Sequence, residues 1–184
     1  MLFVISAPSG AGKTTIIKEL FKLLPELEFS VSATTRKKRD GETDGKDYYF
    51  ISQDDFKKKI DGDEFVEYEE VFGNYYGTLK SEVEPCLGKN RHLIFDVDVK
   101  GALSLKKLYP EAVTVFIDVT LDELVERLKT RGTESNEEIE KRISRIKEEL
   151  EQKKLFDYIV PNPSKPNGLQ NAVKEVEKII NKYK

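Results

Sequence analysis

Side chains that could bind phosphate gather in one short stretch near the start of the chain. The stretch contains Gly10, Gly12, Lys13 and Thr14. Glycines let backbone N–H groups turn toward an anion, and the N-terminus of a following helix adds a partial positive charge. Lys13 could then reach the β and γ phosphates of a nucleoside triphosphate, and the Thr14 hydroxyl could bind Mg²⁺. The predicted loop comprises Ala7, Pro8, Ser9, Gly10, Ala11, Gly12, Lys13 and Thr14.

The flanks of this loop agree with that interpretation. Residues 2–5 form an apolar run typical of a buried strand, and a helical pattern of apolar residues begins at Ile16. The motif G-x-x-x-x-G-K-[ST] is complete except that Ala7 replaces its first glycine, which matters only if that residue needs a positive φ. The alternative is a glycine-rich turn that happens to precede Lys-Thr. The strand and helix flanks favour the phosphate-binding loop.

Two carboxylates follow a second apolar run. Residues 92–98 predict a strand covered on both faces, and Asp96 and Asp98 stand at its C-terminal end. Open parallel sheets bind ligands at that end of their strands. Asp96 is therefore a candidate for the acid that lies near Mg²⁺, together with Thr14. Alternatively, either aspartate caps the helix that begins near Gly101.

A basic loop and an acidic strand lie between these two motifs. The loop, residues 33–46, carries Arg36 and Arg39 and is followed by an aromatic strand over residues 47–51. Such a charge run is usually a solvated surface, but the arginine spacing and the aromatic strand favour an anion site. Residues 64–70 predict another strand. Its alternation puts Val66 and Tyr68 on one face and Glu67 on the other.

The second half of the chain contains two arginine-bearing helices. Thr120 begins a capping box for the first helix, on which Arg127 and Arg131 are four residues apart and share a face. Residues 135–138 would cap the second helix, which carries Arg142 and Arg145. The break between the two helices predicts a hinged lid, although exposed arginines on helices are the common alternative.

Strands and helices alternate along the rest of the chain, which predicts an α/β fold with a mostly parallel five-stranded core sheet. A small α/β insertion over residues 36–78 interrupts it. The core strands are predicted at residues 2–5, 29–32, 92–98, 113–117 and 157–160. Further helices are predicted at residues 52–60, 81–87 and 169–180.

Composition narrows the possible functions. The chain has 184 residues, enough for one domain with a substantial core, and a net charge of −3, which argues against general affinity for nucleic acid or membranes. A single cysteine excludes an internal disulfide, and with a single histidine it makes a transition-metal site unexpected. No apolar run is long enough to cross a membrane, and no signal peptide precedes the first strand. We expect a cytoplasmic protein.

Several of these motifs, in this order, resemble guanylate kinase. They are residues 32–39 (SATTRKKR), 45–48 (GKDY), Glu67, 73–78 (GNYYGT) and 96–98 (DVD), and the resemblance extends from Leu2 to about Val160. It implies a three-layer P-loop fold in one domain over residues 1–184. The core would comprise residues 1–32, 80–121 and 154–184, with a GMP-binding insertion over residues 33–79 and a helical lid over residues 122–153.

The resemblance also implies an activity, the transfer of the γ-phosphoryl group of MgATP to GMP, with dGMP as a further acceptor. Lys13, Arg131 and Arg142 would be catalytic, and Arg127 and Arg131 would join residues 7–14 at ATP. Thr14 and Asp96 would hold Mg²⁺. GMP would contact Ser32, Arg36, Arg39, Tyr48, Glu67, Tyr76, Thr78 and Asp98. Oligomeric state does not follow from the sequence.

Glu67 would select the purine, because the guanine edge offers two hydrogen-bond donors that a carboxylate can accept, whereas adenine offers an acceptor at N1. One departure concerns adenine: the family commonly has Val-Asn-Asp where this chain has Val160-Pro161-Asn162-Pro163. Asn162 could replace the displaced asparagine. The alternatives are a guanylate-kinase-like peptide-binding module without catalysis, and a P-loop kinase for another nucleoside monophosphate.

Overall fold

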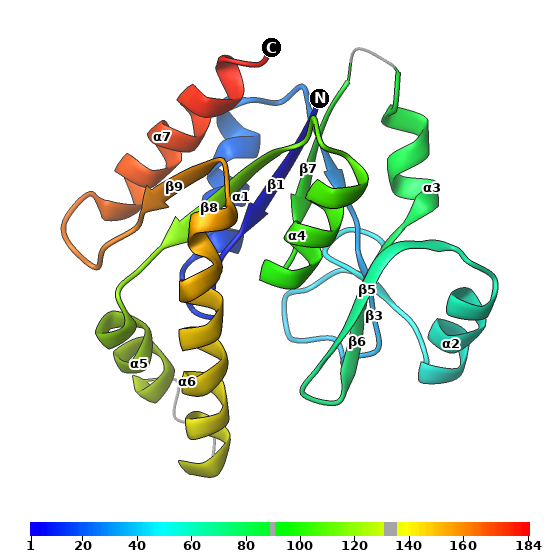
Figure 1. The fold of residues 1–184 in the computed structure, drawn as a ribbon, viewed down its shortest axis with the longest axis horizontal. Helices are drawn as coiled ribbons and strands as arrows, with labels where there is room; N and C mark the ends of the chain where they lie inside the picture. Colours follow the sequence, from blue (N-terminus) through cyan, green and yellow to red (C-terminus); the bar gives the residue numbers. More distant parts are fainter. Residues whose placement is uncertain (89–90, 131–135) are drawn as a thin grey trace.

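Five parallel strands form the central sheet of the computed structural model, which describes residues 1–88, 91–130 and 136–184. In spatial order the strands are β2 (Leu27–Ser30), β7 (His92–Asp96), β1 (Leu2–Ser6), β8 (Val113–Asp118) and β9 (Tyr158–Pro161). Strand β1 lies at the centre, with β7 and β8 on its two sides (Figure 1). The predicted parallel core sheet is confirmed.

Helices cover both faces of this sheet, because β1 is apolar on both. Phe3 and Ile5 pack toward α1 (Lys13–Leu23), α5 (Leu121–Thr130) and α7 (Gly168–Asn181). Leu2 and Val4 pack toward α4 (Val99–Leu108) and α3 (Lys80–Val83) on the opposite face. Figure 1 shows α1 and α7 together on one side of the sheet and α4 on the other. The result is the three-layer arrangement expected from the sequence.

A second, smaller sheet is built from residues between β2 and β7. Its order is β4 (Tyr49–Phe50), β3 (Ala33–Thr34), β6 (Asn74–Leu79) and β5 (Phe65–Val71). Helix α2 (Gln53–Asp61) packs on it through the buried Phe56, which stacks on the ring of Phe65. This sheet lies beside α4 (Figure 1), so its β5 strand faces the central sheet across the N-terminus of α4.

The predicted alternation along β5 is wrong at Val66. The pairing of β5 with β6 shifts register between Phe65 and Glu67, as at a β-bulge. Phe65 and Tyr68 therefore contact each other on the α2 side, whereas Val66 packs toward α4 with the core of the main sheet. A bulge inserts an extra residue and so breaks the period of two. Glu67 nevertheless faces away from Tyr68, as predicted.

Several predicted boundaries also shift. The strand predicted to Asp98 ends at Asp96, and Asp98 instead caps α4 by accepting from the Gly101 N–H at 2.8 Å. The capping alternative is therefore correct for Asp98. The helix predicted over residues 81–87 divides into α3 and a 3₁₀ helix (Glu84–Cys86), since Pro85 has no N–H to continue the α-helical bonds. Within the predicted strand 47–51, Tyr49–Phe50 forms the strand β4, and Tyr48 makes only an isolated bridge with Asp44.

The arginine-bearing helices are α5 and α6 (Asn136–Glu151), and a 3₁₀ helix (Gln152–Leu155) follows α6. Thr120 and Glu123 form the predicted capping box of α5. Ser135, the first residue of the cap predicted over 135–138, and the candidate Arg131 lie outside the described residues. Within the described ranges, every helix is too short or too polar to span a membrane.

Candidate active site

The phosphate-binding loop connects the end of β1 to the start of α1. Gly10 and Gly12 both have a φ of 88°, a region that strains residues with a Cβ atom. At Gly12 a Cβ would also come within 2.8 Å of the Asn162 side-chain nitrogen. Ala7 has no positive φ, so its replacement of the first motif glycine adds no strain. The local geometry thus agrees with a loop whose N–H groups surround an anion.

Two side chains from distant segments fix this loop in place. The buried Asn162 amide, just after β9, donates to the Ala11 carbonyl at 2.7 Å. Arg127 of α5 donates to the Gly10 carbonyl at 3.1 Å and to the Ser164 hydroxyl at 2.8 Å. Arg127 therefore contacts the outside of the loop rather than lining the cavity described below. Both side chains orient the loop by satisfying its carbonyl oxygens.

The end of β7 brings Asp96 to the loop. Lys13 Nζ lies 2.7 Å from Asp96 Oδ1 and also donates to the Val97 carbonyl. The Thr14 hydroxyl is 3.4 Å from the other Asp96 oxygen. A hydroxyl and a carboxylate at one edge of a phosphate loop are hard oxygen donors, which Mg²⁺ prefers, and Mg²⁺ usually takes its other ligands from phosphate and water. Thr14 and Asp96 therefore fit the predicted metal.

Two adjoining cavities open beside the loop. The larger, about 360 Å³, is lined by the whole phosphate loop together with Arg39, Phe72 and Arg142. The smaller, about 150 Å³, continues between the main sheet and β5. Residues that line both are Lys13, Tyr48, Val71, Tyr76, Asp96 and Asp98. The Lys13 ammonium thus stands where a ligand in one cavity would meet a ligand in the other.

Glu67 lines the small cavity, and Thr78, which does not line it, is fully buried and bonds to Glu67. The buried Thr78 hydroxyl donates to Glu67 Oε1 at 2.6 Å, and Ser32 also lines this cavity. Burial raises the pKa of Glu67 to about 7, although the bond from Thr78 opposes the shift. The other carboxylate oxygen, Glu67 Oε2, lies close to Gly101. A Cβ atom at Gly101 would come within 2.8 Å of Oε2, so glycine leaves the room that the carboxylate needs. The carboxylate is held as a hydrogen-bond acceptor with little water around it.

The basic loop places Arg36 beside two aromatic rings. Its guanidinium lies 5.4 Å from the Tyr48 ring centre and 5.6 Å from that of Phe50. It binds both Glu42 oxygens, at 2.7 and 3.0 Å, and Glu42 also accepts from the Arg39 N–H. The two parallel bonds from Arg36 to Glu42 have the geometry with which a guanidinium also binds two oxygens of a phosphate. Burial and the nearby Asp96 charge raise the pKa of the Tyr48 hydroxyl, so Tyr48 remains a donor.

Asp98 belongs to a cluster that the sequence interpretation did not foresee. Arg145 Nη2 of α6 lies 2.6 Å from Asp98 Oδ2 and 3.5 Å from Glu69 Oε1, and its Nε donates to Glu149 at 2.8 Å. Burial and the adjacent Asp98 raise the pKa of Glu69 to about 7. Burial disfavours ionisation of Asp98 too, but hydrogen bonds from Glu69 and Gly101 and the Arg145 charge lower its pKa overall. A proton shared by the two carboxyls therefore resides on Glu69.

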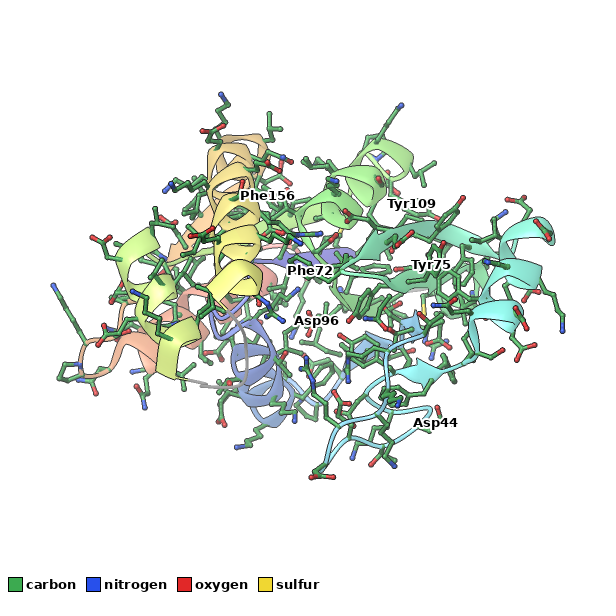
Figure 2. The ribbon with its side chains drawn as sticks, turned by 90° about the horizontal axis from the view of Figure 1, so that it is seen from below. Asp44, Phe72, Tyr75, Asp96, Tyr109 and Phe156 are labelled. Carbon is green, nitrogen blue, oxygen red and sulfur yellow. The ribbon has the colours of Figure 1, made fainter. Side chains whose placement is uncertain are left out.

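Arg142 reaches the large cavity from α6, and its guanidinium lies 5.3 Å from the centre of the Phe72 ring at the tip of the β5–β6 hairpin. Figure 2 shows Phe72 and Asp96 in the central space between α6 and the smaller sheet. Of the predicted arginines, Arg39 and Arg142 line this space and Arg127 does not.

Sequence reasoning missed Glu42, Glu69 and Phe72. It named Arg145 only as an arginine of the predicted lid, and it gave Asn162 a different role. A partial signal existed for Glu69, which follows Glu67 by two residues on a predicted strand. Glu42 follows Arg39 by three residues in a loop, and no periodicity links it to Arg36. Arg145 and Asn162 act through contacts between segments that are far apart in the chain, so no local pattern identifies them.

Comparison with known proteins agrees with this geometry. A family model described as guanylate kinase matches residues 1–183. The guanylate kinase of Carboxydothermus hydrogenoformans is 46% identical over 98% of this chain and 87% of its own length. That of Thermotoga maritima is 45% identical over 97% of this chain and 85% of its own length.

A solved structure shares the fold over the whole chain. The crystal structure of guanylate kinase from Anaplasma phagocytophilum superposes with a TM-score of 0.81 at 26% identity, covering 100% of this chain and 85% of that one. The site agrees with these matches, because its phosphate loop adjoins a second cavity with a buried carboxylate. The family model covers nearly every residue, and the relatives share more than 40% of their residues with this chain. The chain belongs to the guanylate kinase family.

Proposed function

We propose that this chain transfers the γ-phosphoryl group of ATP to GMP, giving ADP and GDP, and that dGMP is a further acceptor. Its family makes it a nucleoside monophosphate kinase. One observation carries the choice of acceptor: the small cavity that adjoins the phosphate loop ends in Glu67, whose carboxylate is oriented by Thr78. The guanine edge presents N1–H and a 2-amino group to such a carboxylate.

The residues would divide the work between the two nucleotides. The loop 7–14 would hold the ATP phosphates, with Lys13 at the junction of the cavities and Arg142 facing it. Arg36, Arg39, Tyr48 and Tyr76 would hold the GMP phosphate. Ser32, Glu67, Thr78 and Asp98 would contact guanine. Arg127 would act on ATP through the loop carbonyl that it holds. We keep Arg131 as a further candidate at the ATP phosphates.

The chemistry requires positioning rather than a general base. The second pKa of a phosphate monoester is about 6, so the attacking oxygen is already largely deprotonated near pH 7. Lys13 and Arg142 would stabilise the charge that shifts toward the leaving oxygen, and the aligned cavities would hold donor and acceptor in line. Mg²⁺, held by Thr14 and Asp96, would neutralise charge on the β and γ phosphates. Exclusion of water from the joined cavities would limit ATP hydrolysis.

The direct test measures ADP release with GMP, dGMP, AMP, UMP and dTMP at equal concentrations. We expect strong preference for the two guanine nucleotides. Comparable turnover with AMP would contradict the role of Glu67 and favour a kinase for another monophosphate. No turnover with any acceptor, combined with retained folding, would favour the peptide-binding module.

A further inference from the structure

Helix α6 and the β5–β6 hairpin come from segments far apart in the chain, and they meet beside the large cavity. Four side chains make the contact, here called the hairpin bridge: Glu69 and Phe72 on the hairpin side, Arg142 and Arg145 on α6. Arg145 lies 3.5 Å from Glu69, and the Phe72 ring centre lies 5.3 Å from the Arg142 guanidinium and 5.8 Å from that of Arg145. Cations over an aromatic face attract it electrostatically.

Phe72 has a backbone conformation and an exposure that are unusual for an aromatic residue. It has a φ of 49°, is followed by Gly73 at 75°, and remains 52% exposed. Two successive positive φ values are typical of a two-residue hairpin turn, where Asn or Gly is common and a bulky residue is strained. Strain of this kind persists where surrounding contacts hold it, and it points to a role for the side chain. The two guanidinium groups over its ring supply those contacts.

The hairpin bridge also connects the two cavities, because one of its arginines lines the large cavity and the other binds a carboxylate of the small one. Arg142 lines the large cavity beside the phosphate loop. Arg145, through its 2.6 Å contact, fixes the Asp98 carboxylate that lines the small cavity. One face of α6 therefore orients a cation for one ligand and an acceptor for the other.

We propose that Arg145 and Phe72 are positioning residues that couple the two nucleotide sites, so that each nucleotide tightens binding of the other through the hairpin bridge. The inference rests on the proposed function, in which the large cavity takes ATP and the small one takes GMP. A donor phosphate that draws Arg142 inward keeps α6 against Phe72, and Arg145 then holds Asp98 for guanine. Linkage makes the effect reciprocal: GMP strengthens donor binding by the same factor.

Calorimetry can measure this coupling as the ratio of two GMP dissociation constants, one without and one with a saturating non-hydrolysable ATP analogue. For the unmodified chain we expect the analogue to tighten GMP binding about tenfold, within the usual range for coupled sites. Arg145→Met keeps length and removes charge, and Phe72→Leu keeps an apolar side chain and removes the ring. Each should reduce the ratio to about twofold or less, since the cation–π and charged contacts are lost.

Two further variants serve as controls. Phe72→Tyr keeps the aromatic ring that Phe72→Leu removes, so it should keep the ratio of the unmodified chain. Lys147→Met alters an exposed residue of α6 that faces the groove with α5, and should leave the ratio unchanged. A purely structural role for Arg145 or Phe72 would lower melting temperature or weaken each nucleotide alone without changing the ratio, and that result would overturn the proposal.

A ratio near one in the unmodified chain, or an unchanged ratio in both Arg145→Met and Phe72→Leu, would also overturn it. The proposed function fails in a different way. If the unmodified chain does not phosphorylate GMP, the assignment of the cavities is wrong whatever the variants do. If it does phosphorylate GMP and the ratio is insensitive to both variants, only the coupling is wrong.

Discussion

Glu67→Gln replaces one carboxylate oxygen with an NH₂ group in the small cavity and tests the choice of acceptor. Thr78 donates to Glu67 Oε1, and it would continue to donate to the amide oxygen of glutamine. The new amide NH₂ would then occupy the position of Oε2, on the side of Gly101. A guanine donor that approaches this position would meet another donor instead of a carboxylate oxygen.

The expected loss follows from hydrogen-bond energetics. A bond to a charged group contributes about 1.5–3 kcal/mol, and a donor left unpaired in a water-poor site costs about 1–3 kcal/mol. Together these terms amount to about 2.5–6 kcal/mol, or roughly 10²–10⁴ in kcat/KM for GMP. AMP carries an acceptor at N1 and no 2-amino group, so its use should not fall. The GMP/AMP ratio should therefore drop by about 100-fold or more.

The same substitution should remove a pH dependence. The pKa of Glu67 is raised by burial to about 7, and the proposed contact with the two guanine donors requires the ionised form. Between pH 8 and pH 6 the ionised fraction falls from about 90% to about 10%, so kcat/KM for GMP should fall about tenfold on acidification. The GMP phosphate, with a second pKa of about 6, adds roughly a further factor of two. Glu67→Gln should retain only this smaller effect.

Coupled ADP release with GMP and AMP, measured from pH 6 to pH 8, gives both results in one assay. Glu70→Gln is the matched control, since Glu70 is an exposed carboxylate on the same strand. An unaltered GMP/AMP ratio in Glu67→Gln would refute guanine recognition by this residue. A pH profile equal to that of the unmodified chain would show that another group titrates.

Two further substitutions, and one further measurement on Glu67→Gln, test the site and its supports. Lys13→Met should abolish turnover while calorimetry still detects GMP binding, because Lys13 lies at the donor loop and next to Asp96; retained turnover would exclude Lys13 from the chemistry. Gly12→Ala should lower the free energy of unfolding by about 1–2 kcal/mol through the positive φ alone. It should also raise KM for ATP, since its Cβ would displace Asn162. An unchanged melting temperature and an unchanged KM would contradict the loop geometry. Glu67→Gln should raise the melting temperature at pH 8: the folded-state pKa of about 7 exceeds the usual value, so stability is lost as pH rises from about 4.5 to 7, and a neutral amide should recover on the order of 2–3 kcal/mol. Calorimetric scans at pH 5 and pH 8 should show a gain only at the higher pH.

What the sequence predicts well is local. The phosphate loop, the strand before it and the helix after it occupy consecutive residues, 2–23, and their chemistry follows from residue type and spacing. Asp96 follows from a similar rule, because an apolar parallel strand places its next polar residue at the ligand-binding edge. The predicted five-stranded sheet rests on the same kind of apolar run.

What the sequence predicts poorly depends on a break in periodicity or on contacts between distant segments. Alternation assigned Val66 and Tyr68 to one face, and the bulge at Val66 separates them, since nothing in the residue types specifies an inserted residue. Arg142 and Arg145 differ by three residues on one exposed-looking helix. Which of them binds Asp98 depends on how α6 approaches α4 and β5, and that is a tertiary property.

The acidic net charge of the chain is compatible with two anionic ligands because most cations at the site already have a carboxylate partner. Lys13 is paired with Asp96 at 2.7 Å, Arg36 with Glu42 at 2.7 Å and Arg145 with Asp98 at 2.6 Å. A free lysine or arginine side chain loses about 2 kcal/mol of rotamer entropy when it is fixed, and these partners fix it before a nucleotide binds. A phosphate dianion presents more charge and more acceptor oxygens than one carboxylate, so it could replace the partner of Lys13 or of Arg36, which are already oriented, while Arg145 keeps Asp98. In the proposed complex the displaced acids would have other groups to bind: the proposed Mg²⁺ for Asp96, and the Arg39 N–H, already bonded to Glu42, for that residue. Carboxylates beside the phosphate sites therefore support binding of anions, since they preorganise the cations that the anions need.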